Sequence, residues 1–309
     1  MYDVLIIGSG PAGLSAAIYA SRANLSYELI EKEEGGTGQI KSTSLVDNYP
    51  GLPQISGYDL GEALRNHALS LGTVFRKGEV SAIERVCSGA GNAPFYRVYT
   101  DGKSAEPLES RTVLYAAGAE HIHLGIPGEQ RLIGAGICFC SVCDGPFFKD
   151  LHVAVIGGGN SALGDALHLS TIAEKVYLVH RRESFRAAAS IVERVKNTPN
   201  IELVLNAVPA EFEGEDELEA IRMEDGRRLP VQGAFVAVGM RPMTKLVEGL
   251  APLDEKGYII ADETGSTAVA GFYAAGDVRT KALRQVITAA SDGAGAIHSI
   301  TGYLQSSGL

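Results

Sequence analysis

The chain carries two copies of one pattern: a short apolar strand, a glycine turn and a run of helix-forming residues. In the first copy, residues 3–7 lead into Gly8-Ser9-Gly10-Pro11-Ala12-Gly13. In the second, residues 153–156 lead into Gly157-Gly158-Gly159-Asn160-Ser161-Ala162. Apolar, β-branched runs of this length are typical of strands buried on both faces of a parallel sheet. The repeat therefore predicts two doubly wound α/β domains.

The glycines of such a turn have separate physical roles at a dinucleotide. The first permits the tight turn, the second lets the backbone approach a pyrophosphate, and the third lets helix and strand pack closely. Strand, turn and helix come in the required order in both copies, so the sequence predicts two dinucleotide sites. A length of 309 residues is long for one hydrophobic core and agrees with two domains.

The two copies differ where their second strand ends. The interval from Gly8 to Glu31 equals the interval from Gly157 to His180, and His180 opens the run His180-Arg181-Arg182, with Arg186 close behind. A carboxylate at this point accepts hydrogen bonds from ribose hydroxyls, whereas arginines suit a 2′-phosphate. We therefore expect FAD or NAD in the first domain and NADPH in the second. The alternative for the arginines is a solvated helix start.

A cysteine pair, Cys140-Ser-Val-Cys143, precedes the second copy. A Cys-x-x-Cys pair can alternate between a disulfide and a dithiol and so carry two electrons. Three of the four cysteines lie within six residues, which indicates redox or metal chemistry rather than a secreted disulfide framework. A structural zinc site usually has a second ligand pair, and none follows, so we expect no metal. Cys138 is expected to be a small buried cysteine, the alternative being a third thiol that exchanges with the pair, and Cys87 is expected in the core.

The remaining segments have weaker patterns. Residues 34–57 predict a long functional loop in which Gly38-Gln39-Ile40 and the stretch around Asn48 would wrap a cofactor. Further expectations are a helix over residues 58–71, antiparallel strands over 79–114 with turns near Gly89 and Asp101-Gly102, a connecting loop over 121–136, and strands with turns over 200–228.

Three buried strands end in small residues, at Gly118, at Gly239 and at Gly276-Asp277. We expect domain boundaries near residues 114–120 and 240–246. The carboxylate of Asp277 could bind a cofactor hydroxyl, and Arg284-Gln285-Val286 is expected on the following helix, whose N-terminus would point at the flavin or its phosphate.

Taken together, these motifs resemble the low-molecular-weight, bacterial-type thioredoxin reductases over almost the whole chain. No single motif would suffice. The resemblance rests on GSGPAG from Gly8, GQI from Gly38, DNYPG from Asp47, CSVCD from Cys140, GGGNSA from Gly157, HRRESFR from His180 and AAGDVRTKALRQV from Ala274.

The resemblance implies two Rossmann-like three-layer domains of the class II pyridine nucleotide-disulfide oxidoreductases. An FAD domain would comprise residues 1–113 and 246–309, and an NADPH domain with the Cys-x-x-Cys would comprise 116–243. The FAD contacts would be Gly8, Ser9, Gly10, Pro11, Ala12, Gly13, Glu31, Gly38, Gln39, Ile40, Asn48, Gly118, Gly276, Asp277, Arg284, Gln285 and Val286. The NADPH contacts would be Gly157, Gly159, Asn160, Ser161, Ala162, His180, Arg181, Arg182 and Arg186.

The implied electron path runs from NADPH through FAD and the Cys140–Cys143 disulfide to thioredoxin or a thioredoxin-like protein. Cys143 would lie nearer the flavin, Cys140 would attack the partner, and Asp144 would protonate the departing thiolate. An aspartate that only caps a helix would look the same in sequence. The resemblance also implies a homodimer and a large rotation of one domain on the other.

Other functions stay open at this point: reduction of a different dithiol carrier, a dithiol oxidase, or a non-catalytic metal-binding or redox-sensing protein. The arginines at 181–182 disfavour the oxidase, which has no need of NADPH. An excess of 37 acidic over 27 basic residues argues against a nucleic-acid partner. No apolar run is long enough to span a membrane, and Asp3 replaces the basic start of a signal peptide. We expect a cytoplasmic protein.

Overall fold

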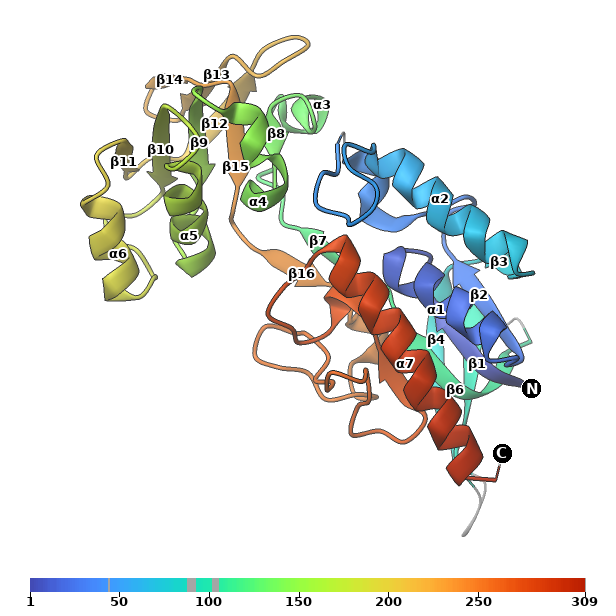
Figure 1. Ribbon diagram of the computed structural model, residues 1–309. Coiled ribbons are helices and arrows are strands. Elements are labelled where there is room, and N and C mark those ends of the chain that lie inside the picture. Colours follow the sequence, from blue (N-terminus) through green and yellow to red (C-terminus); the bar gives the residue numbers. More distant parts are fainter. Residues whose placement is uncertain (44, 88–92, 102–105, 309) are drawn as a thin grey trace. The chain divides into compact units, whose positions relative to one another are not determined.

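A computed structural model describes residues 1–43, 45–87, 93–101 and 106–308 (Figure 1). The chain forms two compact units: residues 1–120 with 241–309, here called unit 1, and residues 121–240, here called unit 2. The expected turns near Gly89 and Gly102 lie outside the described residues. Which cofactor each unit binds stays a prediction.

Unit 1 is built on a seven-stranded sheet in the order β3-β2-β1-β6-β5-β4, in which β17 also pairs with β6. Strands β1, β2, β3, β6 and β17 pair in parallel, and β4, β5 and β6 pair antiparallel. Strand β6 serves both arrangements because its first residues pair with β5 and its last with β17. The strands are Tyr2–Ile7 (β1), Tyr27–Glu31 (β2), Phe75–Lys77 (β3), Val80–Val86 (β4), Phe95–Thr100 (β5), Leu108–Tyr115 (β6) and Phe272–Ala274 (β17).

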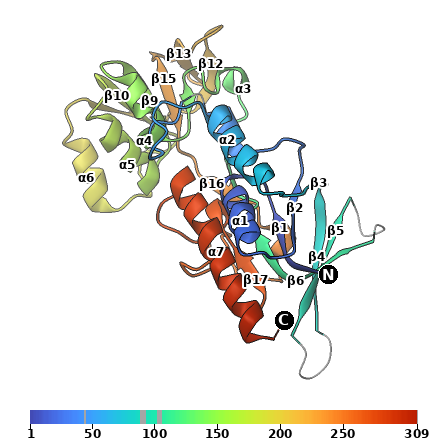
Figure 2. The same cartoon turned by 45° about the vertical axis from the view of Figure 1, so that its right-hand side comes forward.

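Helices α1 (Pro11–Arg22) and α7 (Val286–Ser306) lie side by side on one face of this sheet (Figures 1 and 2). Small residues permit the close approach, since a Cβ on Gly293 would overlap the carbonyl oxygen of Ala12. The other face packs Leu5, Tyr115 and Phe272 into a second core. The remaining elements are α2 (Gly57–Ser70) and the short 3₁₀ turns η1 (Gly38–Ser42), η3 (Lys245–Val247) and η4 (Gly276–Val278).

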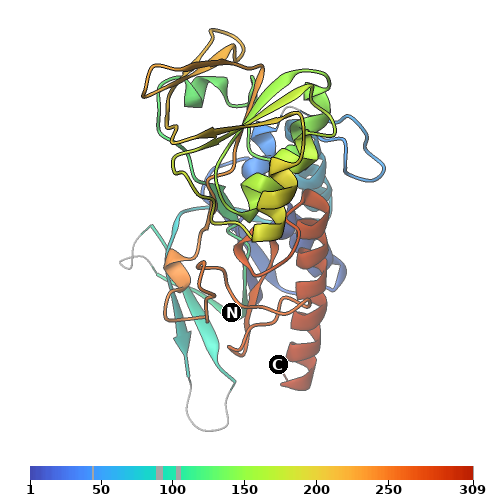
Figure 3. The same ribbon diagram turned by 90° about the vertical axis from the view of Figure 1, so that its left-hand side faces the viewer.

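Unit 2 is built on a parallel five-stranded sheet in the order β11-β10-β9-β15-β8. Helices α5 and α6 cover one face (Figure 3), and an antiparallel sheet of β12, β13 and β14 packs on the other. The elements are α3 (Glu129–Leu132), β8 (Ile137–Cys138), α4 (Ser141–Asp144), η2 (Gly145–Phe148), β9 (His152–Ile156), α5 (Asn160–Leu169), β10 (Lys175–His180), α6 (Ala189–Lys196), β11 (Ile201–Leu205), β12 (Pro209–Glu213), β13 (Ala220–Met223), β14 (Arg228–Pro230) and β15 (Gly233–Val236).

The two sheets share one strand order. The run β3-β2-β1-β6 in unit 1 corresponds to β11-β10-β9-β15 in unit 2, and each first strand leads through its glycine turn into a helix. The predicted pair of doubly wound α/β domains is therefore confirmed. The chain passes between the units in β7 (Ala119–His121) and β16 (Met240–Pro242). No helix in the described ranges is both long and apolar enough to cross a membrane.

Three expectations were wrong in detail. Cys87 is exposed rather than buried, because it follows β4, the edge strand of its sheet. Helix α7 begins only at Val286, so Arg284 precedes the helix and Gln285 is its extended N-cap residue. The stretch expected to be a loop over 121–136 contains α3, a helix too short to show a period. The buried carboxylate of Glu129 at its start accepts hydrogen bonds from the backbone of the preceding turn.

Candidate active site: a disulfide and two glycine turns

The first glycine turn is shaped by contacts that exclude side chains. Gly8 has a φ of +109°, and a Cβ there would lie 2.5 Å from the carbonyl oxygen of Ala116. A Cβ on Gly13 would overlap the carbonyl oxygen of Gly8. The nearest atom to a Cβ on Gly10 would be the Cα of Gly38, at 3.9 Å. The fold therefore brings the GQI segment against the middle of the turn. The second glycine of the motif, Gly10, has no side chain and would let a pyrophosphate approach the backbone.

Glu31, at the end of β2, is buried, and its two carboxylate oxygens accept hydrogen bonds from the Arg65 guanidinium at 2.6 and 2.9 Å. Arg65 comes from α2, and its guanidinium carbon also lies 3.9 Å from the ring centre of Phe75. Sequence reasoning missed Arg65, because one arginine on a predicted amphipathic helix carries no specific signal. The ion pair fixes the carboxylate and leaves each oxygen a further lone pair for a ribose hydroxyl.

Asp277 lies in η4, and among the described residues its buried Oδ1 atom has no hydrogen-bond partner. Burial raises the pKa of this carboxyl, and the nearby charges of Lys281 and Arg284 oppose the rise. The guanidinium of Arg284 donates to the backbone carbonyl oxygen of Asp277 at 3.4 Å. A buried acceptor without a donor is rare in folded proteins. It fits a site in which a ligand hydroxyl supplies the hydrogen bond.

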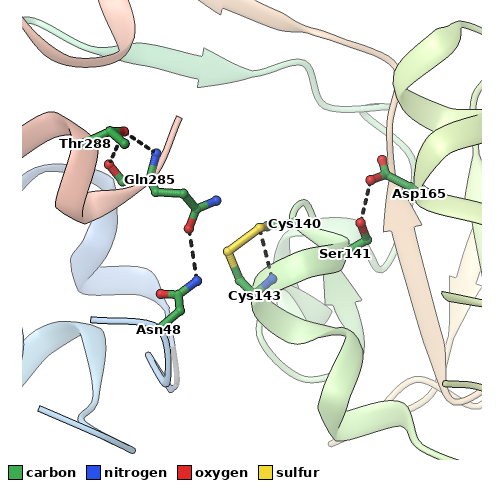
Figure 4. Close-up of a disulfide and its surroundings, with 7 residues drawn as sticks. All are labelled: Asn48, Cys140, Ser141, Cys143, Asp165, Gln285 and Thr288. Atoms are coloured by element: carbon green, nitrogen blue, oxygen red, sulfur yellow. Dashed lines mark hydrogen bonds between the residues drawn. A yellow bond between two sulfur atoms is a disulfide. The ribbon is translucent and has the colours of Figure 1, made fainter. Parts of the chain in front are cut away.

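The start of α7 is tied to the loop that contains Asn48 (Figure 4). The Asn48 amide donates to Oε1 of Gln285 at 3.0 Å, and Gln285 and Thr288 cap the helix reciprocally. The structure therefore brings together two motifs that lie far apart in the sequence. The other predicted FAD residues in unit 1 are placed as follows: Ser9, Ala12 and Ile40 are buried, Pro11 opens α1, Gln39 is exposed, Val286 packs beside Ile40, and Gly118 and Gly276 have positive φ angles.

The second glycine turn repeats the first contact. A Cβ on Gly157 would lie 2.5 Å from the carbonyl oxygen of Ala237, whereas a Cβ on Gly159 would meet nothing within 4 Å. Helix α5 begins directly afterwards, and Oδ1 of Asn160 accepts a hydrogen bond from the backbone N–H of Ala188 at 2.9 Å. Ser161 is exposed and Ala162 is buried. The middle of this turn is thus open, as a nucleotide site requires.

His180 and the arginines behind it have different environments. His180 is buried, its ring stacks on Phe185 at 5.3 Å, and a Cβ on Gly158 would overlap that ring. Burial lowers the pKa of His180. Arg181, Arg182 and Arg186 are all exposed, and none of them forms an ion pair with another described residue. His180 therefore supports the glycine turn, while three guanidinium groups stand free for an anion.

The cysteine pair forms a disulfide, Cys140–Cys143, across the short helix α4 (Figure 4). The backbone N–H of Cys143 points at Sγ of Cys140 at a distance of 3.2 Å. A hydrogen bond to sulfur favours the thiolate over the thiol once the disulfide is opened. Val142, between the two cysteines, is 56% exposed. The redox pair thus lies on an accessible segment of unit 2.

Asp144 ends α4, and burial raises the pKa of its carboxyl to about 6, against hydrogen bonds from the Cys138 thiol and the Cys140 backbone. Burial also raises the pKa of Cys138, with the Asp144 carboxyl adding to the rise. Cys138 is only partly buried. This carboxyl, one residue from the redox pair, therefore keeps its proton up to about pH 6.

One contact of α4 was not predicted. The Ser141 hydroxyl, between the cysteines, donates a short hydrogen bond to Oδ1 of Asp165 on α5 (Figure 4). Ser141 is buried, and burial raises the pKa of Asp165. The sequence signal was weak, because an aspartate in the second turn of a helix is usually exposed.

Comparison with known proteins agrees with this geometry. Residues 2–293 match the family described as pyridine nucleotide-disulphide oxidoreductase. Thioredoxin reductase of Treponema pallidum (strain Nichols) is 40% identical, and the match covers 98% of this chain and 97% of the relative. Thioredoxin reductase of Bacillus subtilis (strain 168) is 38% identical, with 99% and 95% covered.

Solved structures give the same result. The crystal structure of thioredoxin reductase from Streptococcus pyogenes MGAS5005 matches with a TM-score of 0.91 at 38% identity, and the match covers 99% of both chains. Thioredoxin reductase from Giardia duodenalis matches with a TM-score of 0.88 at 33% identity, over 98% of this chain and 99% of that one. The chain belongs to the pyridine nucleotide-disulphide oxidoreductase family and, within it, to the thioredoxin reductases.

Proposed function

We propose that this protein is an NADPH-dependent flavoprotein that reduces the disulfide of thioredoxin or a thioredoxin-like protein. The observation that carries the proposal is the Cys140–Cys143 disulfide in unit 2, the unit that also contains the second glycine turn. Family membership adds the use of flavin and pyridine nucleotide in general. The specific cofactors, FAD and NADPH, and the residues that bind them are part of the proposal.

Unit 1 supports the binding of FAD. The backbone at Gly10 carries no side chain that would keep a pyrophosphate away, Arg65 holds the Glu31 carboxylate in place for ribose hydroxyls, and Oδ1 of Asp277 lacks a donor among the described residues. When bound, a flavin supplies two-electron transfer between reduced nicotinamide and a disulfide. The proposed FAD domain comprises residues 1–113 and 246–309, with the contacts named in the sequence analysis.

Unit 2 supports the binding of NADPH. The open turn at Gly159 would receive the pyrophosphate, and the exposed guanidinium groups of Arg181, Arg182 and Arg186 would bind the 2′-phosphate. The proposed NADPH domain comprises residues 116–243. The arginines favour this assignment over the dithiol oxidase, because such an enzyme has no use for a 2′-phosphate site.

The residues of α4 support thiol–disulfide exchange with a protein. Two electrons and two protons convert the Cys140–Cys143 disulfide into two thiols. The Cys140 thiolate, favoured by the N–H of Cys143, attacks the partner's disulfide and forms a mixed disulfide. Asp144 donates a proton to the sulfur that leaves. Cys143 then attacks Cys140, which releases the partner as a dithiol and closes the disulfide again.

The proposed assembly is a cytoplasmic homodimer. Its support is the resemblance to bacterial-type thioredoxin reductases, together with a cysteine pair that suits a redox role in a reducing compartment. The mass of the purified protein by light scattering tests the dimer directly.

The proposed function is tested by anaerobic addition of NADPH to the purified protein, with and without oxidised thioredoxin. We expect the flavin band to bleach, uptake of more than the two electrons of a flavin alone, and return of the colour with thioredoxin. Cys140→Ser and Cys143→Ser should still bleach but should not be reoxidised by thioredoxin. Bleaching without reoxidation in the unaltered protein would instead point to another dithiol carrier, and absence of bleaching would exclude NADPH as the donor.

A further inference from the structure

The segment that carries the redox pair is attached to α5 at its start. The Ser141 side chain is buried, and its hydroxyl donates to Oδ1 of Asp165 on α5. Figure 4 shows this bond pointing away from the disulfide, toward α5. The hydroxyl therefore donates its hydrogen bond to a residue of α5, a helix of the nucleotide-binding fold.

The same segment is attached to α5 again just after Asp144. A Cβ on Gly145 would lie 3.1 Å from Cδ2 of Leu169 and 3.4 Å from Cδ1 of Ile172. The backbone of η2 thus lies directly against the end of α5 and the turn that follows it. Of the two attachments, only the one at Ser141 is a directional polar contact.

Helix α5 is also the helix of the second glycine turn. It begins at Asn160, directly after Gly159, and Asp165 follows within two turns. Its start is held by the bond from Ala188 to Asn160 and by a bond from the N–H of Arg186 to the carbonyl oxygen of Gly158. One fixed helix therefore has the nucleotide turn at its start and the redox segment on its side.

Helix α4 has four residues, far too few to be stable alone, because nucleation of a helix is costly and is repaid only over longer lengths. The Cys140–Cys143 ring fixes its shape while the disulfide is closed. When the disulfide is open this constraint is lost. The N–H of Cys143 still points at Sγ of Cys140, and the contacts that attach α4 and η2 to α5 then help to keep the two sulfurs near each other. The hydrogen bond from Ser141 to Asp165 is one such contact, and it joins α4 to a longer helix.

We propose that Asp165 is a positioning residue for the dithiol: through Ser141 it keeps Cys140 and Cys143 in one arrangement on α5 when the disulfide is open. The inference deepens the proposed function, on which it rests, since it concerns the reduced state through which the electrons pass. A dithiol that stays arranged re-forms its disulfide readily, because the two sulfurs keep a high effective concentration. Loss of the contact should weaken the tendency to re-form it.

The experiment compares Ser141→Ala, Asp165→Ala, the double variant and Asp165→Asn with the unaltered holoenzyme. The first readout is the equilibrium between Cys140–Cys143 and a series of thiol–disulfide buffers, scored by alkylation. We expect each alanine variant to shift this equilibrium about tenfold toward the dithiol, which is about 30 mV for a two-electron couple. A contact that served only the stability of unit 2 would leave this equilibrium unchanged.

The double variant and the asparagine variant give the inference its specificity. Both alanine changes remove the same hydrogen bond, so the double variant should shift the equilibrium no further than either single variant. Asp165→Asn keeps an acceptor oxygen for Ser141 and should stay within about threefold of the unaltered enzyme; it also remains informative if Asp165→Ala does not fold. Asp216→Asn, at an exposed turn of the same unit, is the matched control and should change nothing.

The kinetic readouts separate this inference from the proposed function. Bleaching of the flavin by NADPH does not use the dithiol and should stay within about twofold in every variant, while reoxidation by thioredoxin should slow about tenfold in the alanine variants. Three results would overturn the role of Asp165. They are an unchanged thiol–disulfide equilibrium in both alanine variants, a shift in the double variant equal to the sum of the two single shifts, and a slowing of bleaching as large as that of reoxidation. Failure of the unaltered enzyme to bleach or to reduce thioredoxin would overturn the proposed function, and the buffer equilibrium needs neither NADPH nor thioredoxin.

Discussion

Units 1 and 2 have nearly the same strand–turn–helix fold, but they differ at the third position of the glycine turn and at the end of the second strand. Each has a buried strand that leads through a glycine turn into a helix. In each, a Cβ on the first glycine would lie 2.5 Å from a backbone carbonyl oxygen of a neighbouring strand's end, Ala116 in one unit and Ala237 in the other. The first glycine is therefore a requirement of the fold itself.

The third position of the turn differs between the units. Gly13 has no room for a side chain, because its Cβ would overlap the carbonyl oxygen of Gly8. Ala162 holds the equivalent position in unit 2 and is itself buried. The third position of the turn thus has no room for a side chain in unit 1, where α1 also packs beside α7.

The ends of the second strands differ in charge. In unit 1 the acid Glu31 is buried and already paired with Arg65. In unit 2 the buried position is taken by His180, and three exposed arginines follow it without ion pairs to other described residues. The comparison teaches that the backbone makes the nucleotide site possible, while a few side chains at one strand end decide which nucleotide suits it.

The largest effect is expected from making the two turns alike at their third position. Gly13→Ala should prevent folding of unit 1 or leave it without flavin, because the overlap is with backbone that cannot move aside. Flavin content and thermal unfolding measure this. Gly159→Ala, where a Cβ meets nothing within 4 Å, is the control and should melt like the unaltered protein. A flavin-loaded Gly13→Ala protein of normal stability would contradict the close packing.

The charge at the end of β2 gives the second effect. Arg65→Leu should lower the free energy of unfolding by about 3–5 kcal/mol, because it leaves the carboxylate of Glu31 buried and unpaired. Denaturant unfolding of the flavin-loaded protein measures it. Arg111→Leu breaks a half-exposed pair with Asp3 and should cost less than about 1 kcal/mol. Equal losses in the two variants would show that the burial of Glu31 is not what matters.

Much of this comparison could be predicted from the sequence. The two turns, their strands and the opposite charges at the strand ends are local patterns, set by glycine stereochemistry and by apolar runs of strand length. What could not be predicted depends on residues far apart in the chain. Arg65 pairs with Glu31, and Ser141 bonds to Asp165, only because the fold packs α2 beside β2 and α4 beside α5.

The errors have the same origin. Cys87 was expected in the core because it has no partner cysteine in the sequence, but it is exposed, since it follows β4 at the edge of the sheet. Gln285 was expected inside α7, but it is the N-cap residue. The helix begins after it because its capping partners are Thr288 within the helix and Asn48 from a distant loop. Local pattern thus located the helix but not its first residue.

The arginines of unit 2 give the third effect. Arg181→Ala and Arg182→Ala should each lower kcat/KM for NADPH by about 10- to 100-fold, since each removes one or more charge-assisted hydrogen bonds to the 2′-phosphate. The values for NADH should stay unchanged, because NADH has no such phosphate. Arg194→Ala, at an exposed position of α6, is the control. A parallel loss with both nucleotides would favour the alternative of a solvated helix start that merely stabilises unit 2.

The smallest expected effect is on the pH dependence of the reaction, and it follows from a comparison of two partly buried aspartates, one from each unit. Burial raises the pKa of both, but Oδ1 of Asp277 lacks a partner among the described residues, whereas Asp144 is hydrogen-bonded and has a pKa of about 6. A carboxyl with a raised pKa keeps its proton as the pH rises past its usual 3.8 and loses it near 6.

If Asp144 is the proton donor, the rate of thioredoxin reduction should decline above about pH 6, which gives the pH–rate profile a descending limb. Asp144→Asn should abolish that limb and lower the rate below it, and Asp150→Asn, an exposed neighbour, should keep it. The native protein also binds more protons than the unfolded chain between pH 3.8 and about 6, so the Asp144 carboxyl makes stability fall as pH rises through that window. Asp144→Asn should remove this dependence too. If the limb persists in Asp144→Asn while the stability profile changes, the carboxyl titrates as stated but is not the proton donor.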